Sequence, residues 1–215
     1  MQAILAGGRV GLVTAIAIVA LLPVRALAGP ACDTTIRVVL ARPGTEFSLV
    51  SQDRRYAFAA SADGRLKVDG HPRAGWTSSP GAASLGGRRV PGRLSVVPER
   101  GELVVIAEAP LEAYVAGVLM GEVPPRWEDQ ALRAQAVVSR SYGLHQRAQN
   151  ARRAYHVEAD TRNQVFEWGA PSEPFTRAVA APRWAVLTWR GAPSLAAFHS
   201  ASRGRAASSR AGWGA

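Results

Sequence analysis

The chain has 215 residues, 47% of them hydrophobic and 20% charged, a composition typical of a globular protein with enough apolar mass for a core. Its net charge is +10, but the arginines are scattered rather than gathered in runs, which argues against a nucleic-acid-binding protein. The positive charge leaves anionic lipid or an acidic cell-wall polymer as possible kinds of partner. The alternative is that the basic surface serves only to keep the protein soluble. The single cysteine, Cys32, excludes an internal disulfide and a cysteine-based zinc cluster.

The first 28 residues have the features of an export signal. Arg9 gives a short positive region, residues 10–24 are almost wholly apolar, and Ala26-Leu27-Ala28 provides a cleavage motif. The apolar stretch is short for a membrane span, so we expect cleavage after Ala28 and a protein of the periplasm or cell wall. An uncleaved membrane anchor is the alternative, and it is the one membrane contact that the sequence predicts.

Residues 33–109 predict an antiparallel β-rich region of roughly five to eight strands. Alternating or β-branched segments indicate strands at residues 35–41, 47–51, 56–60, 65–68, 92–97 and 102–107, the last two forming a hairpin. Residues 71–93 are rich in Gly, Pro, Ser and Arg, and are expected to form a long surface loop or a set of weak strands.

Pro110 begins a helical segment that a pair of prolines interrupts. Apolar residues recur at helical spacing over residues 111–119, and residues 127–144 predict a longer helix that is apolar nearly all round, as in a helix buried on several sides. Between the helices lies Gly-Glu-Val-Pro-Pro, residues 121–125, which places an acidic residue at a helix end.

The rest of the chain predicts shorter elements: a basic loop at 145–156, a turn entering a strand at 160–168, a short helix at 175–181, and strands at 184–189 and 195–198. We therefore predict an α+β fold. Its antiparallel β-rich N-terminal part packs with a helical core of two main helices and further short strands.

Glu122 is the strongest candidate for chemistry. A carboxyl group at a helix end in a cleft can be desolvated and keep its proton for a leaving group, as cleavage of a glycosidic bond requires. The alternative is a local structural role, such as an ion pair with Arg126. No spacing selects a second carboxylate, because Glu128 and Asp129 suit the first turn of a helix and Asp160 suits a turn.

Other polar residues carry weaker signals. The four histidines show no metal-ligand spacing, so we predict no metal and no cofactor. His156 and His199 could converge with Asp160, although a structural histidine is the simpler interpretation. Ser200 beside His199 is no catalytic triad signature, because the chain contains no G-x-S-x-G motif.

Three blocks of sequence resemble the SpoIID/LytB family, the stage II sporulation protein D and amidase-enhancer group. The longest block runs from Leu111 through the two predicted helices and supplies Leu111, Glu112, Tyr114, Gly117, Val118, Glu122, Pro124, Trp127, Ala131, Leu132, Ala134, Gln135, Ala136, Arg140 and Tyr142. The second block supplies Asp160, Thr161 and Gln164, with Phe166 in place of a tyrosine. The third supplies Phe198, Ser200, Ser202, Gly204 and Trp213.

The chain is then divided into the signal peptide predicted above over residues 1–28, a β-rich region over 29–94, and a SpoIID/LytB-like catalytic domain over 95–215. The resemblance implies this last domain, and the family pattern allows that its C-terminal end is truncated. The resemblance also implies a lytic transglycosylase that cleaves peptidoglycan glycan strands, with Glu122 as general acid. The nucleophile is then the C6 hydroxyl of N-acetylmuramic acid, so no second protein carboxylate is needed. The polar residues expected around the sugar are Gln135, Arg140, Tyr142, Gln164 and Ser200.

Departures from the family pattern keep two alternatives open. The family also includes wall-binding amidase enhancers, which implies a non-catalytic protein with a cell-wall amidase as partner. Arg203 stands where a glycine is usual, and family members normally continue beyond the Trp-Gly ending, which points to a truncated, inactive homologue. Some members hold zinc near the second block through cysteine and histidine, but this block contains no cysteine, so we expect no metal there.

Overall fold

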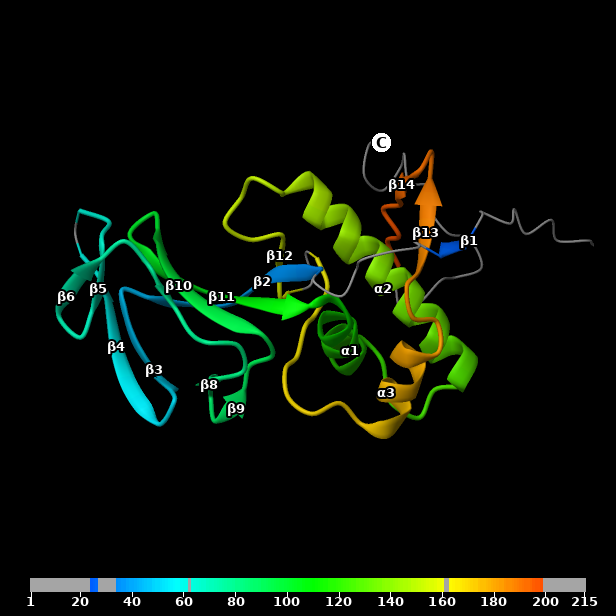
Figure 1. The fold of residues 1–215 in the computed structure, drawn as a ribbon, viewed down its shortest axis with the longest axis horizontal. Helices are drawn as coiled ribbons and strands as arrows, with labels where there is room; N and C mark the ends of the chain where they lie inside the picture. Colours follow the sequence, from blue (N-terminus) through cyan, green and yellow to red (C-terminus); the bar gives the residue numbers. More distant parts are fainter. Residues whose placement is uncertain (1–23, 27–33, 62, 161–162, 199–215) are drawn as a thin grey trace, which may run out of the picture.

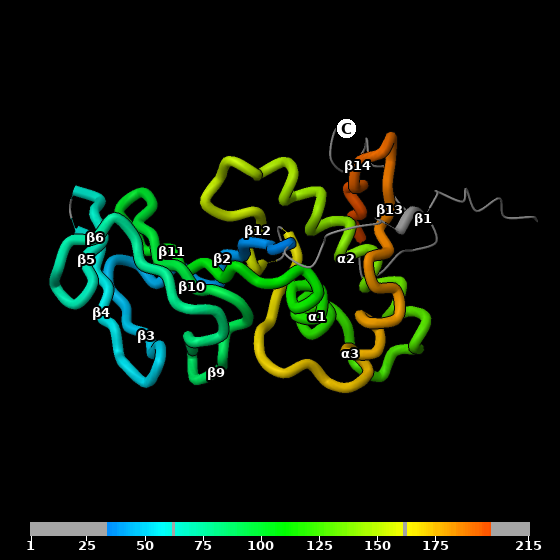
Figure 2. The backbone as a smooth tube through the Cα atoms, in the orientation of Figure 1, coloured from blue at the N-terminus to red at the C-terminus, as the bar shows by residue number. Residues whose placement is uncertain are grey.

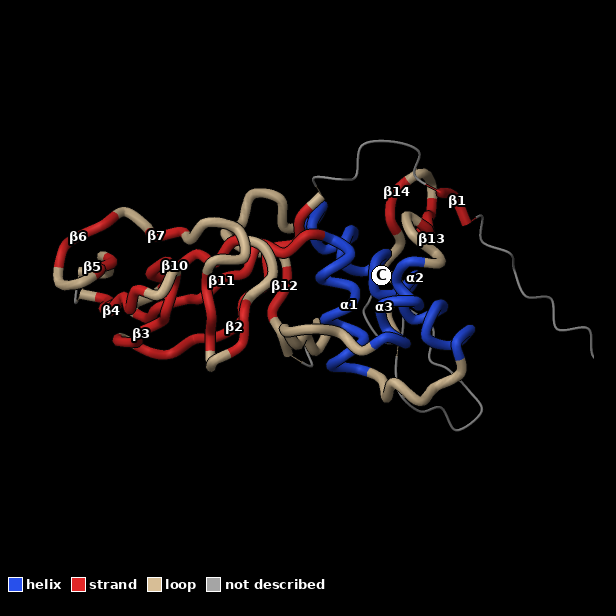
Figure 3. Tube along the Cα trace, turned by 60° about the horizontal axis from the view of Figure 1, so that its bottom comes forward, coloured by secondary structure: helices blue, strands red, loops and turns tan. Residues whose placement is uncertain are grey.

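The computed structural model describes residues 24–26, 34–61, 63–160 and 163–198. Most of the strands gather at one end of the molecule and the helices at the other, where β1, β13 and β14 also lie, with β2 and β11 running between the two ends (Figure 1, Figure 3). The predicted α+β fold, with a β-rich N-terminal part and two main helices, is confirmed.

Two of the sheets form the β-rich end. The six-stranded sheet is antiparallel and has the order β6-β5-β4-β3-β8-β9; its strands are β3 (Glu46–Ser51), β4 (Arg54–Ala60), β5 (Leu66–Val68), β6 (His71–Arg73), β8 (Ala83–Leu85) and β9 (Arg88–Arg89). The five-stranded sheet has the order β12-β2-β11-β10-β7; its strands are β2 (Thr35–Gly44), β7 (Trp76–Thr77), β10 (Arg93–Glu99), β11 (Glu102–Pro110) and β12 (Val157–Glu158). Only the pairing of β12 with β2 is parallel among the pairs of this sheet.

The helical end contains α1 (Leu111–Glu122), α2 (Asp129–Gln149) and α3 (Glu173–Ala180). A three-stranded sheet of order β1-β13-β14 lies beside them, with β1 (Val24–Ala26), β13 (Ala185–Trp189) and β14 (Ala192–Pro193). Within the described residues no helix is long and apolar enough to cross a membrane.

The predicted hairpin between β10 and β11 is confirmed. Glu99 pairs with Glu102, which leaves Arg100 and Gly101 as a two-residue turn. Both turn residues have positive φ, 55° and 84°, as the type I′ turn requires. This turn matches the twist of the strands and fixes the register of β11, whose end leads directly into α1.

The buried apolar side chains form two main clusters. The β core lies between the six-stranded sheet and β10 and β11, and its residues are Leu49, Phe58, Leu66, Val68, Ala83, Val90, Leu94, Val96, Leu103, Val105 and Ala107. The helical core is built from α1, α2, α3 and the first half of β2, where Ile36 and Val38 are fully buried. Leu40 and Trp168 pack against both clusters and so connect them.

The structure corrects several sequence-based boundaries. For residues 71–93 the second of the two expectations, a set of weak strands, is confirmed, because four short strands lie there. The helix α2 continues past its predicted end to Gln149, because its last residues are good helix formers. Residues 195–198 are not a strand; the preceding strand ends at Pro193, which has no N–H to donate to a ladder. Residues 163–168 are also not a strand, because part of their backbone bonds to α1 instead of to a sheet.

The predicted export segment lies largely outside the described residues. Its end, Val24–Ala26, forms β1 and pairs antiparallel with β13. The predicted division after residue 94 falls inside β10, and the five-stranded sheet combines strands from both sides of it.

Candidate active site around Glu122

Glu122 is the last residue of α1. Pro124 and Pro125 follow closely and prevent the helix from continuing. Glu122 is half-buried, and its Oε1 accepts a hydrogen bond of 2.7 Å from the backbone N–H of Val165. Among the described residues no ion pair joins Glu122 to Arg126, so the carboxyl is oriented by a distant part of the chain rather than by its neighbour.

The segment that holds Glu122, residues 163–168, runs along α1 (Figure 2). The N–H of Glu167 donates to the carbonyl oxygen of Gly117 at 3.1 Å. A Cβ atom at Gly117 would lie 2.3 Å from the ring of Phe166, and one at Gly121 would lie 2.6 Å from the carbonyl oxygen of Val165. Gly117 and Gly121 therefore permit the close contact that brings Val165 to Glu122.

Two buried tyrosines, one buried amide and one partly buried amide lie around this contact. The hydroxyl of Tyr114 donates to Oε1 of Gln164 at 2.5 Å, and Nδ2 of Asn163 donates to the Tyr142 hydroxyl at 3.1 Å. Gln164 is only 1% exposed, and its Nε2 has no hydrogen-bond partner among the described residues. Burial, with smaller contributions from Tyr142 and the charge of Glu122, raises the pKa of Tyr114, so its hydroxyl remains a donor.

Gln135 lies on the same face of α2 as Tyr142. Gln135, Ser139 and Tyr142 are spaced four and three residues apart, which aligns them along one side of the helix. Nε2 of Gln135 donates to the Ser139 hydroxyl at 3.4 Å. The structure thus brings Tyr142, Asn163 and Gln164 together near Glu122, with Gln135 about two turns earlier along α2.

Arg140 is placed differently from the other predicted site residues. It is fully buried and forms a two-point ion pair with Glu112, at 3.0 Å and 2.7 Å. It also donates to the carbonyl oxygens of Ala185 and Val179, so it ties α1 and α2 to α3 and β13. Glu112 precedes Glu122 by ten residues, about 15 Å along a helix, so Arg140 lies at the opposite end of α1 from Glu122.

The remaining candidates do not join the Glu122 site in the described structure. Glu128 is exposed just before α2, and Asp129 begins α2 and pairs with Arg133 at 2.7 Å, as expected for residues of a first helical turn. Ser200 and His199 lie outside the described residues. Within the described part of the chain, no three His, Cys, Asp or Glu side chains gather as metal ligands.

Sequence reasoning missed the groups that orient Glu122. The backbone N–H of Val165 carries no sequence signal, and Asn163 lies in residues 160–168, where the sequence predicts only a turn entering a strand. Tyr114 was assigned to the apolar face of α1, although a buried tyrosine hydroxyl needs a polar partner. That requirement could have pointed to Gln164.

The arrangement fixes one oxygen of a half-buried carboxyl group. Oε1 of Glu122 is engaged by a backbone donor, while Oε2 has no hydrogen bond within the described residues. A carboxyl held in this way can present a proton on Oε2 in a defined direction.

Comparisons with known proteins match part of this chain to one family. Residues 99–189 match the family described as SpoIID, Stage II sporulation protein. The chain is 30% identical over 124 residues to Stage II sporulation protein D of Bacillus amyloliquefaciens and to that of Bacillus subtilis, covering 50% of this chain and 36% of each relative. An uncharacterized protein of Brachyspira hyodysenteriae is 36% identical over 84 residues, covering 39% of this chain and 23% of that protein.

The match thus spans about a third or less of the length of these relatives. It nevertheless includes α1, α2, the segment at residues 163–168 and α3, which are the elements that build the Glu122 site. Residues 99–189 therefore form a segment that matches the SpoIID family.

Proposed function

We propose that this protein is an exported peptidoglycan lytic transglycosylase with Glu122 as its general acid. The observation that carries the proposal is the hydrogen bond from the Val165 N–H to Oε1 of Glu122, which orients the carboxyl and leaves Oε2 for proton transfer. The match of residues 99–189 to the SpoIID family supports the broader role of a cell-wall protein related to sporulation.

In the proposed reaction, Glu122 protonates the oxygen that links N-acetylmuramic acid to N-acetylglucosamine. The C6 hydroxyl of the muramic acid attacks C1 as the bond to the leaving oxygen breaks, and its proton returns to Glu122. The products are a 1,6-anhydro sugar end and a free N-acetylglucosamine hydroxyl, and no water is consumed. One carboxyl group therefore acts as acid and then as base.

Three of the polar residues near Glu122 suit the role of substrate contacts. Nε2 of Gln164 is buried and has no partner among the described residues, so a sugar hydroxyl or acetamido oxygen would reach it only if the segment at residues 163–168 moved on binding. Tyr142 and Gln135 lie on one face of α2 and extend the polar surface beyond Gln164. Arg140 is committed to Glu112, and we leave it out of the substrate contacts; Ser200 stays a prediction from sequence.

Glu122→Gln tests the proposal directly. The glutamine keeps an oxygen that can accept from Val165 and removes the transferable proton, so the fold is expected to survive. We expect the rate of anhydro-muramyl product formation from purified glycan strands, measured by mass spectrometry, to fall by about 10²–10⁴-fold.

Glu128→Gln is the matched control, since this glutamate is exposed and precedes α2. It is expected to retain the parental rate, and thermal unfolding of both variants checks their stability. A parental rate in Glu122→Gln would remove Glu122 from the mechanism. A parent protein that yields no anhydro products would instead support the non-catalytic wall-binding alternative.

A further inference from the structure

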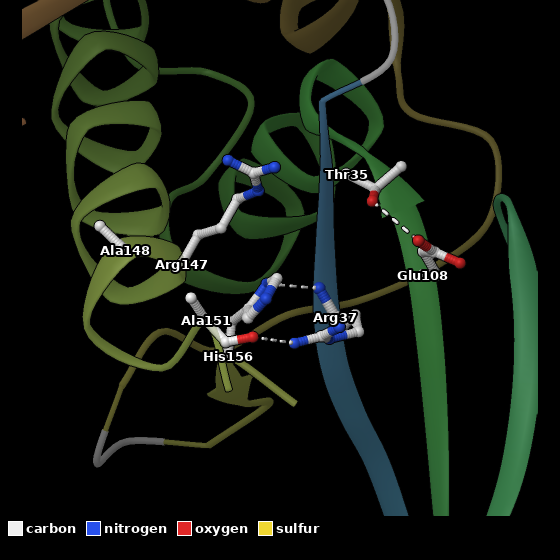
Figure 4. A pocket seen from close by; sticks show the side chains of 7 residues that line it. All are labelled: Thr35, Arg37, Glu108, Arg147, Ala148, Ala151 and His156. Carbon is white, nitrogen blue, oxygen red and sulfur yellow. Dashed lines mark hydrogen bonds between the residues drawn. The ribbon is translucent and has the colours of Figure 1, made fainter. Parts of the chain in front are cut away.

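A polar cavity away from Glu122 lies between the end of α2 and the start of β2 (Figure 4). Its volume is about 270 Å³, enough for a small ligand group. The lining residues are Thr35, Arg37, Glu108, Arg147, Ala148, Ala151 and His156. The proposed reaction at Glu122 uses none of them.

Arg147 is the free cation of this cavity. Its side chain extends from α2 toward β2, and among the described residues it forms no hydrogen bond and no ion pair (Figure 4). Its position five residues after Tyr142 turns it about 140° around α2 from the face that carries Tyr142. A guanidinium group without a protein partner can form a two-point contact with a carboxylate.

His156 supplies a second donor. Its Nδ1 accepts a hydrogen bond from the backbone N–H of Arg37 at 3.1 Å, so the proton of the neutral ring is on Nε2. His156 is buried, and burial together with the charges of Arg37 and Arg147 lowers its pKa to about 4. Near neutral pH the ring is therefore an uncharged N–H donor.

Arg37 binds backbone carbonyl oxygens that lie at the cavity. Its Nη2 donates to the carbonyl oxygens of Ala151 and Arg153, at 3.2 Å and 2.6 Å, which neutralises the exposed carbonyls just after α2 that would otherwise repel an anion. Its Nε is buried and has no partner among the described residues. A buried donor without a partner is costly unless a ligand or water satisfies it.

The charges of the lining favour a monoanion. Arg37 and Arg147 are cationic, while Glu108 is anionic and accepts a hydrogen bond from the Thr35 hydroxyl at 3.0 Å. With His156 neutral, the formal sum is a single positive charge. A carboxylate balances this charge, whereas a phosphate dianion would exceed it and meet repulsion from Glu108.

We propose that this cavity binds a carboxylate group, with Arg147 as the ion-pair partner and Nε2–H of His156 as a hydrogen-bond donor. The site is separate from Glu122, and the proposal does not depend on the reaction there. The geometry indicates that the bound group is a carboxylate. The molecule that carries this carboxylate is to be identified by comparing the binding of different ligands.

The test is an NMR titration of the histidine rings with sodium acetate at constant ionic strength, with chloride as the exchanged anion. His156 is assigned from the signal lost in His156→Asn. We expect a saturable change at His156 and none at His71, which is exposed on β6. Inorganic phosphate is expected to bind more weakly than acetate.

Arg147→Gln is expected to weaken acetate binding by about tenfold or more, since a charge-assisted hydrogen bond is lost. Arg147 is exposed and forms no hydrogen bond or ion pair within the described residues, so this variant is expected to fold. Arg152→Gln is the control, because Arg152 is an exposed arginine near α2 that does not line the cavity. Equal losses in the two variants would show a non-specific charge effect and overturn the proposal.

Two larger ligands then separate the carboxylate sources. N-acetylmuramic acid carries its carboxylate on a sugar, and N-acetyl-D-alanine carries it at a peptide end; tighter binding of either one than of acetate identifies the source. N-acetylglucosamine, which lacks a carboxylate, is expected not to bind. Non-saturable shifts shared by all histidines, or tighter binding of phosphate than of acetate, would contradict a carboxylate site.

Discussion

The two glutamates of α1 make different kinds of contact in this structure. Glu112, near the start of the helix, is paired with the fully buried Arg140. Glu122, at the end, contacts a backbone N–H and no cation among the described residues. Removing one partner of a buried pair leaves an uncompensated charge, so Glu112 and Arg140 are constrained by stability. Glu122 is not part of such a buried ion pair, so this contribution to stability does not explain its presence. That is expected of a residue whose role is chemical.

His156 links stability to pH. Its pKa in the folded protein is about 4, against 6.5 for the unperturbed group. Between these values the unfolded chain binds more protons, so the free energy of unfolding falls as pH decreases from 6.5 to 4. We expect His156 to contribute a loss on the order of 2 kcal/mol over this range, allowing for partial solvent access to the ring.

His156→Asn tests this prediction, because the amide oxygen can still accept from the Arg37 N–H but does not titrate. Urea unfolding at several pH values should show a smaller loss of stability for this variant than for the parent as the pH decreases. His71→Asn, on the exposed strand β6, should follow the parent. Parallel curves for all three proteins would show that His156 does not titrate as described.

At the scale of elements, the important contact is between α1 and residues 163–168. In Gly117→Ala the new Cβ would lie 2.3 Å from the Phe166 ring and 2.5 Å from the Glu167 carbonyl oxygen, so the segment must move away from α1. Overpacking of this kind costs about 1–3 kcal/mol in stability. Because Val165 moves with the segment, we also expect the proposed transglycosylase rate to fall further than the loss of folded protein explains.

Gly75→Ala is the control for this variant, since nothing lies within 4 Å of a Cβ at that position. Both stability and product formation should match the parent there. If Gly117→Ala kept the parental rate while folded, the contact would serve packing alone.

The same contact shows how far the sequence could predict the site. Gly117, Glu122 and Gln164 stand at positions that the family pattern marks, whereas Gly121 does not, and helical periodicity predicts α1 and α2. Residues 163–168 were nevertheless predicted as a strand, because an extended apolar-polar alternation looks the same whether its backbone bonds to a sheet or to a helix. Arg140 was predicted at the sugar because sequence cannot tell which buried polar group will find a protein partner.

At the scale of the whole molecule, the β core and the helical core share elements. Strand β11 contributes Leu103, Val105 and Ala107 to the β core and then runs directly into α1. Strand β2 pairs with β11 and with β12, and Leu40 and Trp168 contact both cores. Neither core can therefore lose its structure without exposing apolar surface of the other, which predicts one cooperative unfolding transition.

Leu103→Ala in the β core and Leu119→Ala in the helical core test this coupling, since both leucines are fully buried. Each is expected to lower the free energy of unfolding by about 2–5 kcal/mol. Circular dichroism follows the helices and tryptophan fluorescence samples both ends, so coincident curves in every variant are expected if the cores unfold together. Two separate transitions, each shifted by one of the variants, would show that the β-rich end and the helical end are independent. In that case the Glu122 site would depend for its stability on the helical core alone.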